Sequence, residues 1–184
     1  MTTALVVGDL QVGITRDYAF SRQVLAPVAA LLPRARAAGV LPVFVRTAFR
    51  PNRTDLAETN PLITAFFDTG DAFREGAPET EVDPALVRDA GDVTVLKRRA
   101  SAFAGTDLDL VLRARGVDEI VLTGVATSAM IAATAYAAAD RDYRVTVLRD
   151  CCADADDDLH QAFVRSIFPA RGMAVALSED WDPA

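Results

Sequence analysis

The sequence predicts an α/β protein in which helices cover both faces of a parallel β-sheet. Short apolar runs rich in β-branched residues alternate along the chain with helical patterns, the order that gives parallel strands with right-handed crossovers. The apolar runs are nearly continuous, as expected for strands buried on both faces. With 184 residues, 51% of them hydrophobic and 24% charged, the chain is sized for one domain. We therefore expect a single three-layer α/β domain over residues 1–184.

Six apolar runs are expected to form the strands of this sheet. They are residues 4–8, 41–47, 93–96, 119–123, 144–148 and 173–177. Five helical patterns lie between or after them, at residues 20–38, 84–90, 107–115, 127–139 and 156–168. The first three patterns end at Gly39, Gly91 and Gly116, which suit helix C-caps.

Residues 48–81 interrupt this alternation with a long segment that contains Pro51, Pro61 and Pro78. Segments of that length inside a compact domain often serve as binding loops or lids. We expect this one to close over a pocket or to meet another subunit. A connection with no role beyond structure is an equally open alternative.

The composition argues against several classes of partner. A net charge of -7 at pH 7 disfavours nucleic-acid phosphate and anionic membranes. Residues 120–139 carry no charge, but they are rich in alanine and contain Gly124, so a buried strand and helix explain them better than a membrane span. Cys151 and Cys152 are adjacent and form no disulfide framework. The beginning of the chain lacks the pattern of a secretory signal, so we expect a cytoplasmic protein.

Chemistry in such a sheet is expected beyond the carboxyl ends of the strands, where Asp9, Thr47, Lys97 and Gly124 lie. An ammonium group on Lys97 near Asp9 would hold that carboxylate ionised or adjust its proton affinity. A cap or salt bridge at Asp9, and a solvated pairing of Lys97 beside Arg98 and Arg99, are the alternatives.

The strand-to-helix turn at residues 124–130 offers backbone N–H groups to an anion or a developing oxyanion, with Thr127 or Ser128 as helix N-cap. A simple capped turn is the alternative. Ser128 lacks a base for nucleophilic catalysis, because His160 is the one histidine and lies in a late helical pattern.

The metal and cofactor patterns that we considered find little support. One histidine and a vicinal cysteine pair do not provide zinc-ligand spacing, and the aspartates of residues 150–158 are interpreted as solvated surface. The sequence has neither a G-x-G-x-x-G motif nor a P-loop. We expect no metal and no cofactor.

Three ordered motifs resemble the isochorismatase-like, or cysteine hydrolase, superfamily: ALVVGDLQ at 4–11, KRRASAFAGTDL at 97–108 and LTGVAT at 122–127. Segments 140–143, 150–154 and 168–169 continue the resemblance over almost the whole chain. It implies a Rossmann-like sheet with strand order 3-2-1-4-5-6 and a catalytic Asp, Lys and Cys. Asp9 and Lys97 match the first two, whereas Met130 stands at the cysteine position.

The resemblance also implies where a substrate would bind. It places a cis peptide at Val125–Ala126, before the nucleophile position, with the following amides as an oxyanion hole. The expected substrate-binding residues are those of the motifs and of the turn, with two arginines that could pair with a substrate anion: Gln11, Phe103, Val125, Ala126, Thr127, Ser128, Arg46 and Arg50. A surface ion pair is the alternative for each arginine.

Met130 removes the thioester chemistry of the family amidases. Isochorismatases of this superfamily also lack the cysteine: their aspartic acid protonates an enol ether, and pyruvate leaves after water adds. We therefore expect a hydrolase of a small, anionic metabolite that uses Asp9 and Lys97. Water-mediated amide hydrolysis and a non-catalytic binding or oligomer-forming protein remain alternatives. The resemblance also implies a homodimer or homotetramer.

Overall fold

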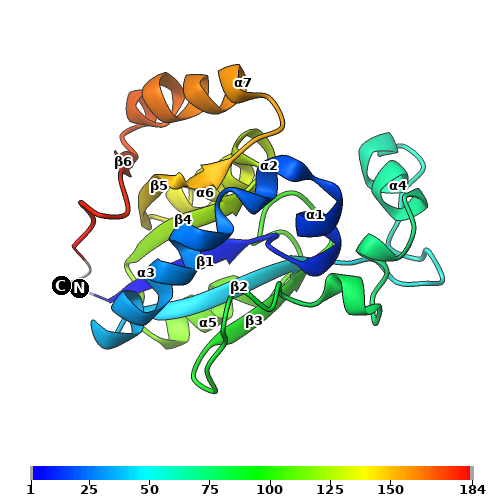
Figure 1. The fold of residues 1–184 in the computed structure, drawn as a ribbon, viewed down its shortest axis with the longest axis horizontal. Helices are drawn as coiled ribbons and strands as arrows, with labels where there is room; N and C mark the ends of the chain where they lie inside the picture. Colours follow the sequence, from blue (N-terminus) through cyan, green and yellow to red (C-terminus); the bar gives the residue numbers. More distant parts are fainter. Residues whose placement is uncertain (1, 183–184) are drawn as a thin grey trace.

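The computed structural model describes residues 2–182 as a six-stranded sheet between two layers of helices (Figure 1). The strands run in the order β3-β2-β1-β4-β5-β6 and every neighbouring pair is parallel, as predicted. Their bounds are β1 Thr3–Gly8, β2 Leu41–Thr47, β3 Val93–Lys97, β4 Glu119–Val125, β5 Arg144–Ala153 and β6 Ala174–Ala176. β5 is longer than expected and β6 shorter.

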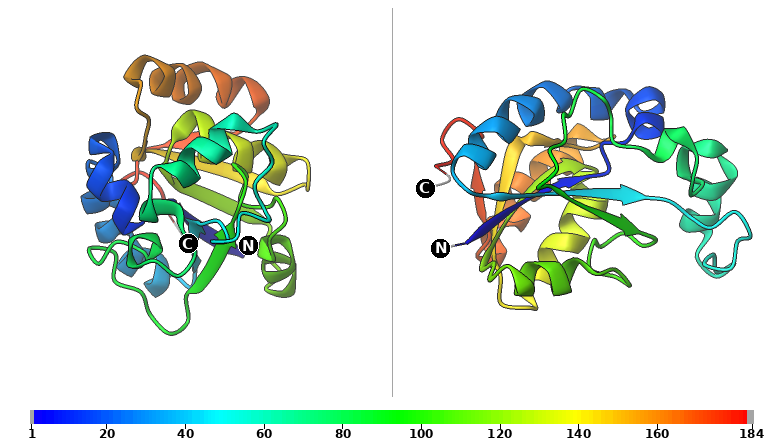
Figure 2. Two further views of the ribbon diagram at one scale, coloured as in Figure 1. Left: turned by 90° about the vertical axis from the view of Figure 1, so that its right-hand side faces the viewer. Right: turned by 90° about the horizontal axis from the view of Figure 1, so that it is seen from below.

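The two faces of the sheet belong to different parts of the chain. Helices α1 (Val12–Asp17), α2 (Ala19–Arg22) and α3 (Leu25–Ala37) cover one face, and α5 (Leu108–Ala114) and α6 (Ala132–Ala139) lie on the other (Figure 2). The side chains of β1 separate accordingly, because Ala4 and Val6 pack into one core and Leu5 and Val7 into the other. A central strand buried on both faces explains its unbroken apolar sequence.

Several predicted helices differ in detail. The pattern at 20–38 forms α2 and α3 with a break between them, and α1 was not expected. A π-helical turn, η3 (Thr127–Ile131), precedes α6, and the last pattern forms α7 (Asp157–Ala162) followed by the π-helical turn η4 (Phe163–Ile167) and the 3₁₀ turn η5 (Pro169–Arg171).

The prediction of a helix at 84–90 is wrong. The Asp83 carboxylate accepts the N–H of Ala85 at 2.9 Å and the Asp83 carbonyl accepts that of Leu86, so the chain turns locally instead of starting a helix. Leu86 alone is buried in this stretch, which leaves no apolar stripe for a helix to pack.

The 48–81 segment is not a structureless loop. It contains α4 (Pro61–Asp68) and the 3₁₀ turns η1 (Asp71–Phe73) and η2 (Pro78–Thr80), and it extends beyond the carboxyl end of β2 (Figures 1 and 2). Asn60 caps α4 by accepting the Ile63 N–H, and Pro61 occupies the first turn. Ile63 and Phe67 anchor the helix through their buried side chains.

None of the helices at residues 2–182 is long and apolar enough to cross a membrane.

Candidate functional site

Three side chains meet at the carboxyl ends of β1, β2 and β3. Lys97 Nζ lies 2.8 Å from Asp9 Oδ2 and donates to Thr47 Oγ1 at 2.6 Å, while Thr47 Oγ1 donates to Asp9 Oδ1 at 2.8 Å. All three residues are buried. The expected proximity of Asp9 and Lys97 is confirmed, and Thr47 closes the triangle between them.

The local backbone places Asp9 at the edge of the sheet. Its φ angle is 57°, in the left-handed region where aspartate is tolerated better than most residues, and its N–H donates to Val45 O at 2.9 Å. The turn directs the carboxylate toward the end of β3 rather than along β1. This geometry accounts for an acid that follows an apolar strand directly.

The side chain of Gln11 stabilises this arrangement through hydrogen bonds to the main chain. Its side chain accepts the Thr47 N–H at 2.8 Å and donates to the carbonyls of Thr47 and Ala72, and it is fully buried. The structure therefore places Gln11 as a clamp between α1, β2 and η1. It does not line the cavity described below.

A cavity of about 270 Å³ opens above Asp9, Thr47 and Lys97. Its walls are mainly apolar and come from α1, α4, η1 and the β4–η3 turn. Arg99 adds a second cation to the lining, besides Lys97. The lining includes Ile14, Tyr18, Phe20, Leu62, Ile63, Phe66, Phe73, Ala100, Val125, Ala126, Ala129, Met130 and Ala155. Thus α4 and η1 of the 48–81 segment supply part of the cavity wall, through Leu62, Ile63, Phe66 and Phe73.

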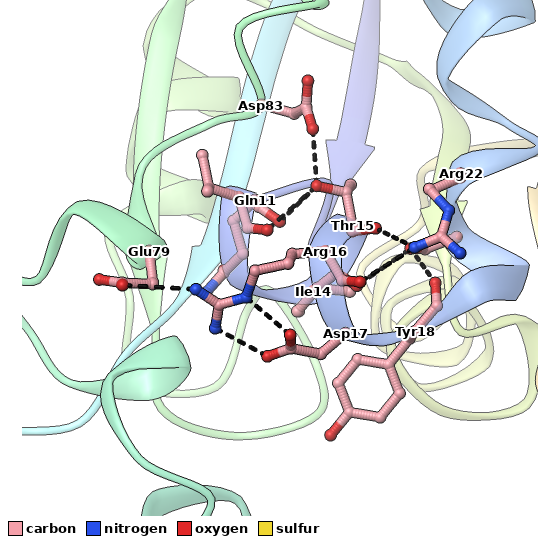
Figure 3. A network of polar contacts seen from close by, with 11 residues as sticks. Gln11, Ile14, Thr15, Arg16, Asp17, Tyr18, Arg22, Glu79 and Asp83 are labelled. Atoms are coloured by element: carbon pink, nitrogen blue, oxygen red, sulfur yellow. Dashed lines mark hydrogen bonds and ion pairs between the residues drawn. The ribbon is translucent and has the colours of Figure 1, made fainter.

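Polar contacts hold α1 in the orientation that turns Ile14 and Tyr18 toward this cavity (Figure 3). Thr15 Oγ1 donates to Asp83 Oδ2 at 2.6 Å, and Arg22 donates to the last carbonyls of the helix, those of Thr15 and Arg16. The start of α1 has no side-chain cap, and the Val12 N–H there donates instead to Glu81 O at 2.9 Å.

Met130 lines the cavity together with Asp9 and packs over Gly8 of β1. Its side chain is 2% exposed, and a Cβ atom placed on Gly8 would overlap its Sδ. Gly8 pairs with Gly124 on β4, so the floor between these strands has no side chain of its own. The thioether fills that space, and it has neither a nucleophilic anion nor a proton to donate.

The two cysteines do not supply a nucleophile to the cavity. Both are free and buried, and neither lines the cavity. Burial raises the pKa of Cys151 to about 12 and that of Cys152 well above its usual value. A thiol with such a pKa is protonated at neutral pH and is a poor nucleophile.

The β4–η3 turn has the expected cis peptide at Val125–Ala126, and both residues line the cavity. Two of its amides are already engaged, because Ser128 N donates to Asp154 Oδ2 at 2.7 Å and Ala129 N donates to Ala126 O. Thr127 faces away, with Oγ1 2.8 Å from Nδ1 of His160. Burial lowers the pKa of His160, so its ring is neutral at pH 7.

The remaining predicted residues lie outside the lining. Arg46 pairs with Glu81, Arg50 pairs with Asp55, and Phe103 stacks on Tyr143 in the core. Sequence reasoning missed Arg99 as a cavity residue, because it was considered only within the alternative of a solvated basic triplet. Successive residues of an extended segment point to opposite sides, so Arg99 shares the side of Lys97 and Arg98 does not, and that pattern would have separated the two arginines.

Residues 3–180 match the model of the isochorismatase domain. The chain belongs to the isochorismatase family. It is 35% identical over 182 residues to the uncharacterized isochorismatase family protein YwoC of Bacillus subtilis, covering 96% of this chain and 91% of that one. It is also 34% identical to a maleamate amidohydrolase of Pseudomonas putida, over 86% and 76% of the two chains.

Solved structures agree with this assignment. The isochorismatase-family chain superposes on a cysteine hydrolase from Pseudomonas syringae with a TM-score of 0.88, at 27% identity over 97% of this chain and 89% of that one. The N-carbamoylsarcosine amidase of Thermoplasma acidophilum gives a TM-score of 0.81 at 26% identity, with 99% of both chains covered. The family and its relatives are hydrolytic.

Among residues 2–182, no group of three or more His, Cys, Asp and Glu side chains is arranged to hold a metal ion.

Proposed function

We propose that this isochorismatase-family protein hydrolyses an enol ether of a small anionic metabolite without a cysteine nucleophile. The observation that carries the proposal is the buried triangle of Asp9, Thr47 and Lys97 beneath an apolar cavity whose floor is a thioether. Enol-ether hydrolysis needs a proton donor and a carboxylate, and both are present. It requires neither a thiolate nor an oxyanion hole.

In this mechanism the Asp9–Lys97 pair supplies one proton, which Asp9 delivers to the enol carbon. The Asp9 carboxylate then stabilises the oxocarbenium ion electrostatically, and this stabilisation is strong because the cavity walls are apolar. Water adds to that ion and returns a proton to the pair. The hemiketal collapses to an alcohol and a ketone, which is pyruvate when the substrate is an enolpyruvyl ether. The Thr47 hydroxyl forms hydrogen bonds with both Asp9 and Lys97 and so fixes the position of one relative to the other.

Water-mediated amide hydrolysis is the second candidate, favoured by the similarity to a maleamate amidohydrolase and an N-carbamoylsarcosine amidase. Here Asp9 would act as the base toward water. An amide substrate generates an oxyanion that needs free donors, and the engaged amides of Ser128 and Ala129 do not provide them, which leaves that role to the other amides of the turn.

The test is pyruvate release from isochorismate, with ammonia release from maleamate and simple amides measured in parallel. Asp9→Asn is the test variant. Asp92→Asn is the matched control, since Asp92 forms a buried ion pair with Arg36 and does not line the cavity. Pyruvate from the parent and from Asp92→Asn, but not from Asp9→Asn, supports the proposal. Ammonia alone supports the amidase, and silence in both assays favours a non-catalytic binding protein.

A further inference from the structure

Arg98 and Arg99 follow β3 side by side but have different partners. Arg98 pairs with two carboxylates, at 2.6 Å from Asp55 Oδ2 and 2.5 Å from Glu75 Oε2. The guanidinium of Arg99 donates to main-chain carbonyls, those of Asp55 and Arg98. No ion pair within residues 2–182 joins Arg99 to a carboxylate.

Arg99 is also the one of the two that lines the cavity. The charges of Asp9 and Lys97 in the same lining cancel, so the cavity has a single excess positive charge in a chain of net charge -7. A partly buried guanidinium whose charge has no counter-charge is costly, and a carboxylate is the group that matches its planar donors best.

We propose that Arg99 is the specificity residue that binds the carboxylate of the ligand. This inference rests on the proposed site and names the chemical class of its ligand, a small molecule with a planar carboxylate on an apolar body. The apolar part contacts the aromatic wall, including Phe66 and Phe73, while the reacting atoms lie over Asp9 and Lys97. The Asp55 and Arg98 carbonyls fix the guanidinium before the ligand arrives, which reduces the entropy lost on binding.

Binding of benzoate and of its neutral isostere nitrobenzene, measured by isothermal titration calorimetry, tests the proposal without turnover. The variants are Arg99→Gln and the charge-conserving Arg99→Lys. Arg53→Gln is the matched control, because Arg53 is an exposed cation paired with Asp68 outside the cavity. Thermal unfolding of each variant verifies that it is folded.

The parent and Arg53→Gln are expected to bind benzoate about tenfold or more tighter than nitrobenzene, the contribution of a charge-assisted hydrogen-bonded pair. Arg99→Gln should abolish that preference while nitrobenzene affinity stays within about twofold, and Arg99→Lys should keep part of it. An unchanged benzoate preference in folded Arg99→Gln overturns the proposal, and so does a parent that binds neither probe. If Arg99→Gln does not fold, a full benzoate preference in Arg99→Lys overturns it, because a bidentate contact would have been lost.

The same titrations on Asp9→Asn separate this inference from the proposed hydrolysis. A benzoate preference that depends on Arg99, in a protein that releases neither pyruvate nor ammonia, retains the carboxylate site and rejects the enzyme. Turnover that depends on Asp9 but not on Arg99 retains the proposed enzyme and rejects the carboxylate site at Arg99.

Discussion

Individual side chains decide both the depth of the cavity and its charge. Met130 sets the depth because its thioether occupies the space over Gly8. Asp9, Lys97 and Arg99 set the charge, and each lies at the end of a strand or one turn beyond it.

Gly8→Ala should impair ligand binding more than stability. The added Cβ overlaps Sδ and Cε of Met130, which are the flexible end of a side chain, and the free direction for that end is into the cavity. We expect benzoate affinity to fall at least about tenfold with about 1 kcal/mol of destabilisation. Calorimetry and urea unfolding measure the two effects.

The double variant Gly8→Ala with Met130→Ala is the control for that prediction. Shortening residue 130 removes the overlap, so binding should return toward the parent value. A double variant that binds as poorly as Gly8→Ala alone would show that Gly8 acts by another route.

Asp9→Asn should destabilise the fold by about 3 kcal/mol, because it leaves the buried ammonium of Lys97 without a counter-charge. Adding Lys97→Met to this variant should recover most of the loss, since it removes the unpaired charge as well. Urea unfolding of the parent, both single variants and the double variant completes the cycle. Additive losses would mean that the two groups do not interact.

At the scale of elements, the site depends on how α7 and the 48–81 segment are tied to the sheet edge. His160 of α7 contacts Thr127 at the β4–η3 turn, and Asp55 of the 48–81 segment contacts Arg98 beyond β3. His160 and Asp55 are therefore the side chains whose substitution tests how firmly each element is held.

The His160 contact predicts a pH-dependent stability. Burial, the largest cause, lowers the pKa of His160 below the 6.5 of an unfolded chain, so the unfolded state binds more protons as the pH falls. The free energy of unfolding should therefore decrease as the pH drops below about 6.5. Urea unfolding between pH 5.5 and pH 8 measures this slope. His160→Gln should flatten it, and an unchanged slope would assign the pH dependence to other groups.

Asp55→Asn should loosen the 48–81 segment. The Asp55 carboxylate is 8% exposed and accepts hydrogen bonds from Arg98 and from the Arg50 N–H. Its loss should raise the rate of limited proteolysis between residues 50 and 75 several-fold while the sheet stays folded. Asp68→Asn, which removes an exposed pair with Arg53, is the control and should leave the cleavage rate near that of the parent.

Much of the fold and half of the site follow from the sequence, for reasons that these elements make plain. Strand positions were predictable because strands buried on both faces have unbroken apolar sequences, and Asp9 and Lys97 were predictable because parallel strands end at one edge. The helix α1 was not predictable from the sequence, because its start depends on Gln11. The side chain of Gln11 binds residues 36 and 61 positions away. Arg99 was missed because neighbouring cations look alike until their partners are known.

At the scale of the whole molecule, the charges of the chain and of the cavity are opposite. The chain has a net charge of -7, and the acidic run Asp154, Asp156, Asp157 and Asp158 lies beside Ala155 at the cavity. An anionic ligand is thus repelled at long range and attracted at the end of its path by Arg99.

The opposite signs of these charges predict that added salt accelerates the association of an anionic ligand with the protein. Raising the ionic strength from about 0.01 M to about 0.15 M shortens the Debye length from about 30 Å to about 8 Å, which screens the acidic surface more than the partly buried guanidinium of Arg99. The association rate of benzoate, measured by stopped flow, should rise by about twofold, and that of nitrobenzene should not change. A benzoate rate that falls with salt would mean that Arg99 dominates at long range.

The facing glycines of β1 and β4 have a consequence for how the chemistry of this scaffold can change. Gly124 has a φ of 111°, and a side chain there would collide with the backbone of Gly8, so β4 cannot reshape the floor, and β1 can do so only by displacing Met130. Residue 130 alone fills the vacancy above them. Position 130 is therefore the place where a single substitution changes the cavity floor from an apolar plug to open space without any rebuilding of the sheet.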